Sequence, residues 1–379
     1  LDFRKEKTIG HITFLENKDG WHGKTLNDLE LGKALEELKE IQMPNVEIIK
    51  SNEIKFEFKQ DPIKINDYNI GEQISTREAY GKALGKLSNG SNKIMVVDAE
   101  VSNSTFSDEV RKVNEKQFIE TYIAEQNMVG ICLGLSKKGY NVFGSSFSAF
   151  LSRAHDQLRM SAISSWKFTM CGSHCGVSIG EDGASQMGLE DISIFRSLNG
   201  SSVFYPSDAV STEKIVNLAC ELEGIKYIRT TRGKTSVIYK NDEKFDVGDF
   251  KALREGKKDK AVLVGAGITL HECLKAYDEL KNKNIETAVV DLYCIKPFKA
   301  EKFIEFVKKH GRKIIVVEDH YKEGGIGEML CCGLKNSEIE IDHLFVKELP
   351  HCGKPGELLE KYGIDSVNIT KTVLGLKKQ

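Results

Sequence analysis

The sequence predicts an α/β protein with two parallel-sheet domains, one after the other along the chain. Short apolar runs with the length of buried strands, such as Ile-Met-Val-Val at residues 94–97, alternate with segments of helical period. This alternation is typical of parallel sheets, whose strands are joined by crossover helices. It stops in a polar stretch at residues 240–260 and then restarts, so the 379 residues are expected to form more than one folded unit.

The first domain is predicted over residues 73–239. Its opening helix covers residues 76–87, where apolar side chains recur with helical spacing, and the strand at 94–97 follows. The remaining elements, in chain order, are strand 118–123, helix 126–138, strand 140–144, helix 148–161, strand 167–171, helix 187–197, strand 202–205 and helix 209–222. Helices and strands therefore alternate through this domain.

The second domain is predicted over residues 261–379. Its elements are strand 261–264, helix 270–281, strand 287–290, helix 300–310 and strand 313–317. Residues 240–260 carry polar runs such as Lys-Asn-Asp-Glu-Lys and are predicted to be a linker. Residues 1–72 are rich in Lys, Glu, Asn and Asp and lack continuous periodicity, so they are not expected to fold alone.

The composition argues against several classes of function. Lys and Arg total 54 against 56 Asp and Glu, so the net charge of -2 gives no global field for nucleic acid or an acidic membrane. No run of about 18 apolar residues and no secretory signal occur, which predicts a cytoplasmic protein. The nine cysteines have no framework spacing and are expected to be reduced. Residue 1 is Leu, not Met, which suggests the later part of a longer chain.

One glycine-rich turn resembles a nucleotide-binding loop only superficially. Gly265-Ala266-Gly267 lies between a predicted strand and a predicted helix, where backbone N–H groups could bind an anion. A dinucleotide fingerprint needs a third glycine, but Leu270 stands three residues after Gly267. We therefore interpret this segment as a tight strand-to-helix turn.

A cysteine and histidine cluster raises the question of a metal site. Cys171, His174 and Cys175 offer two sulfurs and an imidazole within five residues, yet no fourth zinc ligand stands nearby. A buried cysteine or a substrate-contacting histidine explains the cluster more simply. The glycines that follow, at 176, 180 and 183, indicate a backbone that curls tightly.

Glu125 follows the predicted strand 118–123 and stands at the start of a predicted helix. A carboxylate there offsets the helix macrodipole, which is a purely structural explanation. Alternatively, it lies at the carboxyl edge of a parallel sheet, where open α/β folds bind ligands. The neighbouring motifs decide between these two interpretations.

Several motifs, in order along almost the whole chain, resemble transketolase of the animal type. They are residues 75–81 (Ser-Thr-Arg-Glu-Ala-Tyr-Gly), 103–107 (Asn-Ser-Thr-Phe-Ser), 122–128, 171–187 (beginning Cys-Gly-Ser-His-Cys-Gly), 204–208 (Phe-Tyr-Pro-Ser-Asp), 317–328 and 353–355 (Gly-Lys-Pro). The resemblance implies that residues 73–239 form a pyrimidine-binding domain for thiamine diphosphate and that 261–379 form the transketolase C-terminal domain. Residues 1–72 would be a linker and the remnant of a preceding domain, with 16–24 resembling its last motif.

In this family the preceding N-terminal domain holds the diphosphate of the cofactor and a divalent metal, Mg or Ca. The Gly-Asp-Gly metal motif with its downstream Asn is not found; Gly248-Asp249-Phe250 does not complete it. No metal-binding residue is therefore predicted in this chain. The cofactor expected for it is thiamine diphosphate, with the metal held outside the chain.

The resemblance also implies cofactor contacts. The Glu125 carboxyl would bond to N1' of the aminopyrimidine, so that its general-acid role is exerted through the ring. Phe150 matches the ring that stacks on the pyrimidine, and Gln186 matches another cofactor-contacting position. His22 matches a histidine near both cofactor and substrate, where a neutral imidazole could pass protons. Without the resemblance, a core Phe, a solvated amide and a structural His would be the simpler interpretations.

Substrate contacts are implied at five positions. Sugar phosphates need cationic donors for the phosphate and polar groups for the hydroxyls. The matching residues are Arg77, Ser104, His174, Asp182 and Arg232, with His22 as a further contact. Taken one by one, each would otherwise be interpreted as a surface ion pair or a local cap.

The resemblance thus implies a transketolase, which transfers a two-carbon glycolaldehyde unit from a ketose phosphate to an aldose phosphate in the pentose phosphate pathway. Its sites form between subunits, so a homodimer or a pairing with a diphosphate-binding half is expected, and this chain alone is expected to be inactive. The β subunit of a 2-oxoacid dehydrogenase and deoxyxylulose phosphate synthase share the two later domains, but residues 171–186 argue against both. A catalytically incomplete transketolase-like binding or regulatory protein is the alternative.

Overall fold

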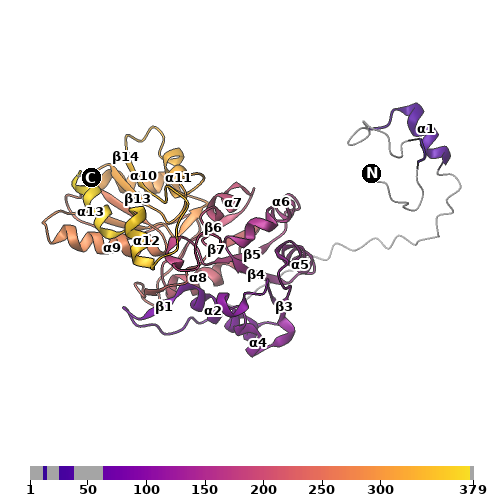
Figure 1. The fold of residues 1–379 in the computed structure, drawn as a ribbon, viewed down its shortest axis with the longest axis horizontal. Helices are drawn as coiled ribbons and strands as arrows, with labels where there is room; N and C mark the ends of the chain where they lie inside the picture. The colour runs from indigo at the N-terminus through magenta and orange to yellow at the C-terminus, as the bar shows by residue number, and fades with distance from the viewer. Residues whose placement is uncertain (1–11, 15–24, 38–62, 376–379) are drawn as a thin grey trace. The chain divides into compact units, whose positions relative to one another are not determined.

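The computed structural model describes residues 12–14, 25–37 and 63–375. The chain forms two compact units, residues 1–55 and 56–379. In the first unit, α1 (Asp28–Glu37) begins at a reciprocal cap, in which the Glu30 N–H donates to Asn27 Oδ1 and the Asn27 N–H donates to the Glu30 carboxylate, both at 2.9 Å. The other described elements belong to the second unit (Figure 1).

A seven-stranded sheet forms the centre of the predicted first domain. In spatial order its strands are β12 (Cys294–Lys296), β6 (Ser202–Phe204), β7 (Ile225–Arg229), β5 (Phe168–Ser173), β4 (Asn141–Phe147), β2 (Ile94–Asp98) and β3 (Phe118–Glu120). Every neighbouring pair is parallel except β12 with β6. The central strands β2, β4 and β5 are buried throughout. Strand β2 is accordingly an almost continuous apolar run, whereas β4 and β5 also carry buried Ser, Thr and Gly residues.

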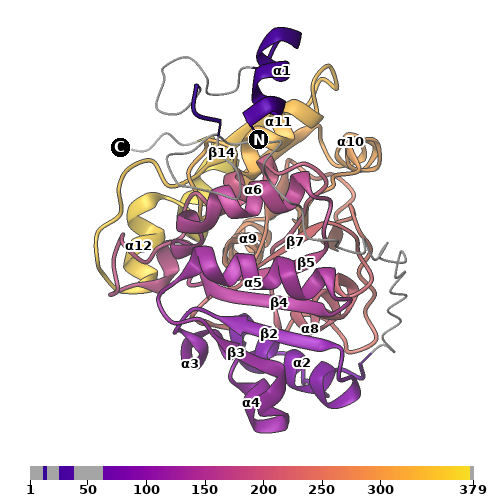
Figure 2. The ribbon, with the colours of Figure 1, turned by 90° about the vertical axis from the view of Figure 1, so that its right-hand side faces the viewer.

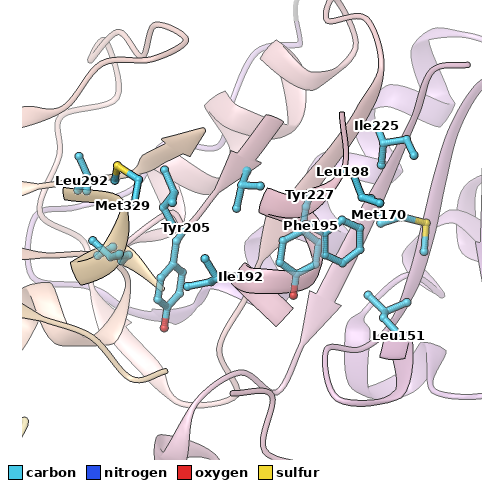
Figure 3. Close-up of a cluster of buried hydrophobic side chains, with 14 of the residues drawn as sticks. Leu151, Met170, Ile192, Phe195, Leu198, Tyr205, Ile225, Tyr227, Leu292 and Met329 are labelled. Atoms are coloured by element: carbon cyan, nitrogen blue, oxygen red, sulfur yellow. The ribbon is translucent and has the colours of Figure 1, made fainter. Parts of the chain in front are cut away.

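Helices cover both faces of this sheet (Figure 2). On one face, α2 (Thr76–Gly90) packs against α8 (Ala209–Ala219) over one hydrophobic core. On the other, α5 (Glu125–Lys137) packs on β4 and on α6 (His155–Ile163), and α7 (Asp191–Ser197) extends this layer. Figure 3 shows the second core, where the Phe195 and Tyr227 rings stack with centroids 3.9 Å apart. Short elements connect these layers: α3 (Ser102–Thr105), α4 (Glu109–Val113), and the 3-10 turns η1 (Glu115–Gln117), η2 (Phe150–Ala154) and η3 (Val177–Ile179).

A five-stranded sheet forms the second domain. Its strands, in spatial order, are β14 (Glu340–Leu344), β13 (Lys313–Val317), β10 (Val262–Gly265), β11 (Ala288–Asp291) and β9 (Lys251–Arg254), and only β9 is antiparallel to its neighbour. The helices of this domain are α9 (Ile268–Lys281), α10 (Ala300–Lys309), α11 (Ile326–Gly333), α12 (Pro355–Tyr362) and α13 (Ser366–Leu374). Two short strands, β1 (Gln73–Ser75) and β8 (Lys234–Ser236), pair separately. The α/β class with parallel-dominated sheets is thus confirmed.

Each of the two sheets has an edge strand that the sequence did not assign to it. The stretch expected to be a linker, 240–260, contains β9, which pairs with β11 and becomes an edge strand of the second sheet. Conversely, β12 comes from the C-terminal part of the chain and pairs with β6 of the first sheet. Polar composition alone did not indicate β9, because every second residue of an edge strand faces solvent.

Two expected elements differ in detail, and strand β7 is an addition to the expected elements. The helix expected at 148–161 is two pieces, since a 3-10 turn (η2) precedes α6. The strand expected at 118–123 ends at Glu120, because Tyr122 adopts a left-handed φ of 56°. Strand β7 was not expected, because Lys226 and Arg229 interrupt its apolar pattern although both are buried. Within the described residues, no helix has the length and apolarity to cross a membrane.

Candidate active site at the carboxyl edge of the first sheet

Five parallel strands, β2, β3, β4, β5 and β7, end at the same edge of the seven-stranded sheet. The loops that follow them carry most of the predicted site residues. Ser104 follows β2, Glu125 follows β3, Phe150 follows β4, His174 follows β5 and Arg232 follows β7. The topology therefore brings together residues that are far apart in the sequence, at the edge where open α/β sheets bind ligands.

Glu125 is the first residue of α5, and its side chain is only 5% exposed. A carboxylate at this position also interacts favourably with the helix dipole, so the structural interpretation is compatible with the functional one. Its partner is Arg153, whose Nη1 donates to Glu125 Oε1 at 3.0 Å. This buried carboxylate pairs with a guanidinium that is itself 57% exposed.

Aromatic rings lie next to this ion pair. Phe150 stacks on Phe147 with centroids 5.1 Å apart, and Phe147 stacks on the His174 imidazole at 3.7 Å. The Arg153 guanidinium carbon lies 5.4 Å from the Phe150 ring centroid. A continuous row of planar groups therefore runs from Arg153 to His174.

His174 is buried, and its surroundings favour the neutral imidazole. Burial, followed by the positive charges of Arg77 and Arg232, lowers the pKa of His174 to about 3. Its Nδ1 lies 2.9 Å from Ser173 Oγ, and its backbone has a left-handed φ of 58°. The ring is thus held in a fixed orientation as a neutral hydrogen-bonding group.

Arg77 stands at the start of α2 and spans towards the loop after β2. Its Nη1 donates to the Ser104 carbonyl at 2.8 Å, while its Nε is buried without a hydrogen-bond partner. Burial and the charge of Arg232 lower the pKa of the Arg77 guanidinium from its ordinary value. An orphaned buried donor beside a second arginine is suited to an anionic ligand.

Arg232 and Asp182 form the opposite side of this basic cluster. Arg232 Nη1 donates to Asp182 Oδ2 at 2.9 Å and to the Ile179 carbonyl at 3.1 Å. The loop of Arg232 is tied to α2, because the Thr231 N–H donates to Thr76 Oγ1 at 2.9 Å. These contacts hold Arg232 near Arg77 and fix the loop that carries Asp182.

The two remaining predicted residues are Gln186 and His22. Gln186 is partly buried, and its backbone N–H donates to the Gly183 carbonyl at 3.1 Å within its own turn. His22 lies outside the described residues, as does the motif at 16–24. Neither Phe147 nor Arg153 was expected from the sequence. Their only signal is spacing, since they lie three residues before and three residues after Phe150.

The cysteine and histidine cluster at 171–175 and the glycine turn at 265–267 contact other parts of the protein. Cys175 Sγ lies 3.1 Å from the Gly172 carbonyl, and within 12–14, 25–37 and 63–375 no group of three or more His, Cys, Asp and Glu side chains could hold a metal ion. At the glycine turn, the Gly267 N–H donates to Ser207 Oγ at 2.9 Å. A Cβ at Gly267 would lie 2.0 Å from the Tyr205 ring, so this turn packs tightly against the first domain.

Known domain families match both parts of this chain. Residues 72–237 match the transketolase pyrimidine-binding domain, and residues 249–369 match the transketolase C-terminal domain. A solved structure described as "split gene transketolase, inactive beta4 tetramer" has a TM-score of 0.72 and 32% identity, and the match covers 80% of this chain and 98% of that one. The chain belongs to the transketolase family. Human transketolase is 43% identical over 372 residues, which are 96% of this chain and 60% of the human protein.

The family assignment confirms the resemblance seen in the sequence. A mouse transketolase-like protein 2 is 49% identical over 308 residues, which cover 81% of this chain and 49% of the mouse protein. The chain therefore spans about half to three fifths of the length of these relatives. A transketolase structure from Campylobacter jejuni, at 20% identity and a TM-score of 0.72, agrees in fold. The second domain match begins at residue 249, ahead of β9.

The residues present fit the pyrimidine part of thiamine diphosphate. One planar guanidinium reaches both the Glu125 carboxylate and the Phe150 ring, at 3.0 Å and 5.4 Å. A single flat group that hydrogen-bonds to this carboxyl can therefore also lie against this phenyl ring. For the metal, the described residues contain no group of three or more His, Cys, Asp and Glu side chains that could hold the ion.

Proposed function

We propose that this chain supplies the pyrimidine half of a transketolase site, which transfers a two-carbon glycolaldehyde unit from a ketose phosphate to an aldose phosphate in the pentose phosphate pathway. The observation that carries the proposal is a buried carboxylate, Glu125, at the same sheet edge as stacked aromatic rings and a pair of arginines. Thiamine diphosphate, when bound, supplies the electron sink for breaking and forming the carbon–carbon bond.

Glu125 holds a proton at its carboxyl and shares it with the ring nitrogen of the aminopyrimidine. Its burial supports this role, because a carboxyl withdrawn from water forms a stronger and better-oriented hydrogen bond. Phe150, backed by Phe147, offers a flat surface for the pyrimidine. Gln186 and His22 complete the cofactor contacts in this proposal.

The substrate is bound by the basic cluster. Arg77 and Arg232 bind the sugar phosphate, since they are the adjacent cations of this edge. Neutral His174 donates or accepts a hydrogen bond at a sugar hydroxyl, and Asp182 and Ser104 accept from others. Xylulose 5-phosphate and ribose 5-phosphate are substrates of the appropriate class.

The complete site needs a second polypeptide region that grips the diphosphate and a divalent metal, Mg or Ca. We place this chain in a cytoplasmic homodimer or in a pair with a diphosphate-binding half. The similarity to a split-gene transketolase supports the second arrangement, because that protein is a match for 80% of this chain. Without such a region this chain does not turn over substrate.

The test is reconstitution. The 379-residue chain is mixed with a separately expressed N-terminal transketolase domain, thiamine diphosphate and Mg, and turnover of xylulose 5-phosphate with ribose 5-phosphate is followed. Turnover that requires both polypeptides supports the proposal. Its absence, when the two polypeptides co-elute in size-exclusion chromatography and bind the cofactor, contradicts it.

A second function has a specific observation in its favour. The structure similar to this chain is described as an inactive tetramer of one subunit type, so a family member of this extent can assemble without activity. A non-catalytic binding or regulatory role for this chain predicts assembly with itself or with a full-length transketolase, and no turnover in the mixture. The same reconstitution experiment separates the two functions.

A further inference from the structure

Arg153 contacts both groups that the proposed cofactor site needs. It lies three residues after Phe150 within the 3-10 turn η2, so the two side chains project from the same face of that turn. Its Nη1 donates to Glu125 Oε1 at 3.0 Å, and its guanidinium carbon lies 5.4 Å from the Phe150 centroid. The ion pair joins residues 28 positions apart in the sequence.

The aminopyrimidine, on the proposed function, requires the same carboxylate and the same ring. Both the guanidinium and the aminopyrimidine are flat groups that can hydrogen-bond to a carboxyl group and stack on aromatic rings. We propose that Arg153 competes with the aminopyrimidine for Glu125, and that it acts as a gate that must swing away before the cofactor ring is seated. This inference rests on the proposed function.

The two partners also compete for a carboxyl group that is hard to reach. Arg153 Nη1 lies 3.0 Å from Glu125 Oε1, and the Glu125 side chain is only 5% exposed, so few directions of approach are open to a second partner. A guanidinium that stayed in place would keep the ring nitrogen away from this carboxyl, so withdrawal of Arg153 is part of seating the cofactor ring.

The contacts of Arg153 permit such a movement. Its side chain is 57% exposed, and its described polar contact is a single hydrogen bond to Glu125. Ion pairs with one well-solvated partner contribute little to stability, and a long arginine side chain has several alternative rotamers. The gate therefore lowers the apparent affinity for the pyrimidine by a modest factor and does not block the site.

The test uses the full chain and 4-amino-5-hydroxymethyl-2-methylpyrimidine, the pyrimidine half of thiamine, as the probe. Its dissociation constant is measured by NMR titration for the wild type, Arg153→Met, Glu125→Gln and the control Arg159→Met, which removes an exposed arginine of the adjacent helix α6. We expect Arg153→Met to bind the probe roughly three- to tenfold more tightly, on the scale of one exposed ion pair. Arg159→Met should bind it as the wild type does.

Equal or weaker binding by Arg153→Met, with binding still lost in Glu125→Gln, overturns the gate and leaves the proposed function intact. Probe binding that does not depend on Glu125, or none in any variant, overturns both. A second measurement uses the wild type alone. Labelling of Arg153 by phenylglyoxal, read by peptide mass spectrometry, should accelerate when the probe is added, because the released guanidinium enters solvent. Protection by the probe contradicts the gate.

Discussion

Replacing Arg229 by Met should cost more stability than any single surface change in this chain. Arg229 lies on β7 and is fully buried. Its Nε donates to Asp191 Oδ2 and its Nη1 to Asp319 Oδ1, both at 2.8 Å, and its Nη2 donates to the Gly188 carbonyl at 2.9 Å. Asp319 follows β13 of the second sheet, so one guanidinium joins the two domains.

The magnitude follows from what the substitution leaves behind. Burial raises the pKa of Asp191, but Arg229, together with His320 and the Tyr227 hydroxyl, outweighs burial and holds that pKa below its ordinary value. Burial raises the pKa of Asp319 despite the same arginine. Removing the cation leaves two carboxylates in the interior, with Tyr227 donating to Asp191 and Tyr205 donating to Asp319 as their main remaining donors. Breaking a buried pair in this way costs about 3–5 kcal/mol.

Urea unfolding at pH 7, followed by circular dichroism, measures this loss for Arg229→Met against the control Arg159→Met, which should change stability by less than about 0.5 kcal/mol. The deficit should shrink at pH 4.5, because the unpaired carboxylates then accept protons. Asp319→Asn in the Arg229→Met background should restore part of it. A deficit below about 1 kcal/mol, or one independent of pH, would mean that Arg229 does not neutralise two buried carboxylates.

Three further predictions concern titration and packing. Burial raises the pKa of Asp291 to about 7, so the stability that the protonated Asp291 carboxyl contributes is present below about pH 4 and is lost as the pH rises to 7. In urea unfolding, Asp291→Asn should be about 2–4 kcal/mol more stable than the wild type at pH 8 but not at pH 4. Stability equal to that of the wild type at both pH values would contradict this prediction. The pKa of His174 is about 3, so its ring NMR signals should not titrate between pH 5 and 8, and stability should fall as the unfolded chain protonates this histidine below pH 6.5. At Gly183, φ is +78° and a Cβ would lie 2.6 Å from Cys352 Sγ, so Gly183→Ala should lower the free energy of unfolding by about 1–3 kcal/mol. The control is Gly200→Ala, which should lose less, because Gly200 has φ +67° but open space around it. Equal losses in the two variants would contradict the predicted clash with Cys352.

Strands such as β2 and β13 could be predicted because most of their side chains are apolar on both faces of the sheet. Runs such as 94–97 and 313–317 need no distant partner to be recognised. Strand β7 could not be found in this way, since Arg229 is buried only because Asp191 and Asp319 surround it. Those partners are 38 and 90 residues away, and local periodicity carries no information about them.

The candidate site also combines residues that local sequence could indicate with contacts that it could not. Glu125 could be singled out because it follows a predicted strand and begins a helix, but its role came from the resemblance and not from spacing. Arg153 could not be anticipated as its partner, because that ion pair depends on how η2 and α5 pack. The Phe147–His174 stack likewise forms only when β4 and β5 become neighbours.

The central claim is that Glu125 is the proton-sharing carboxyl of a transketolase site. The most direct measurement is the turnover of Glu125→Gln in the reconstituted assembly, at saturating thiamine diphosphate and Mg, relative to the wild-type chain. We expect a loss of about 10²–10⁴-fold, the scale of a general acid–base contribution, with assembly unchanged. Turnover within about twofold of wild type would contradict it.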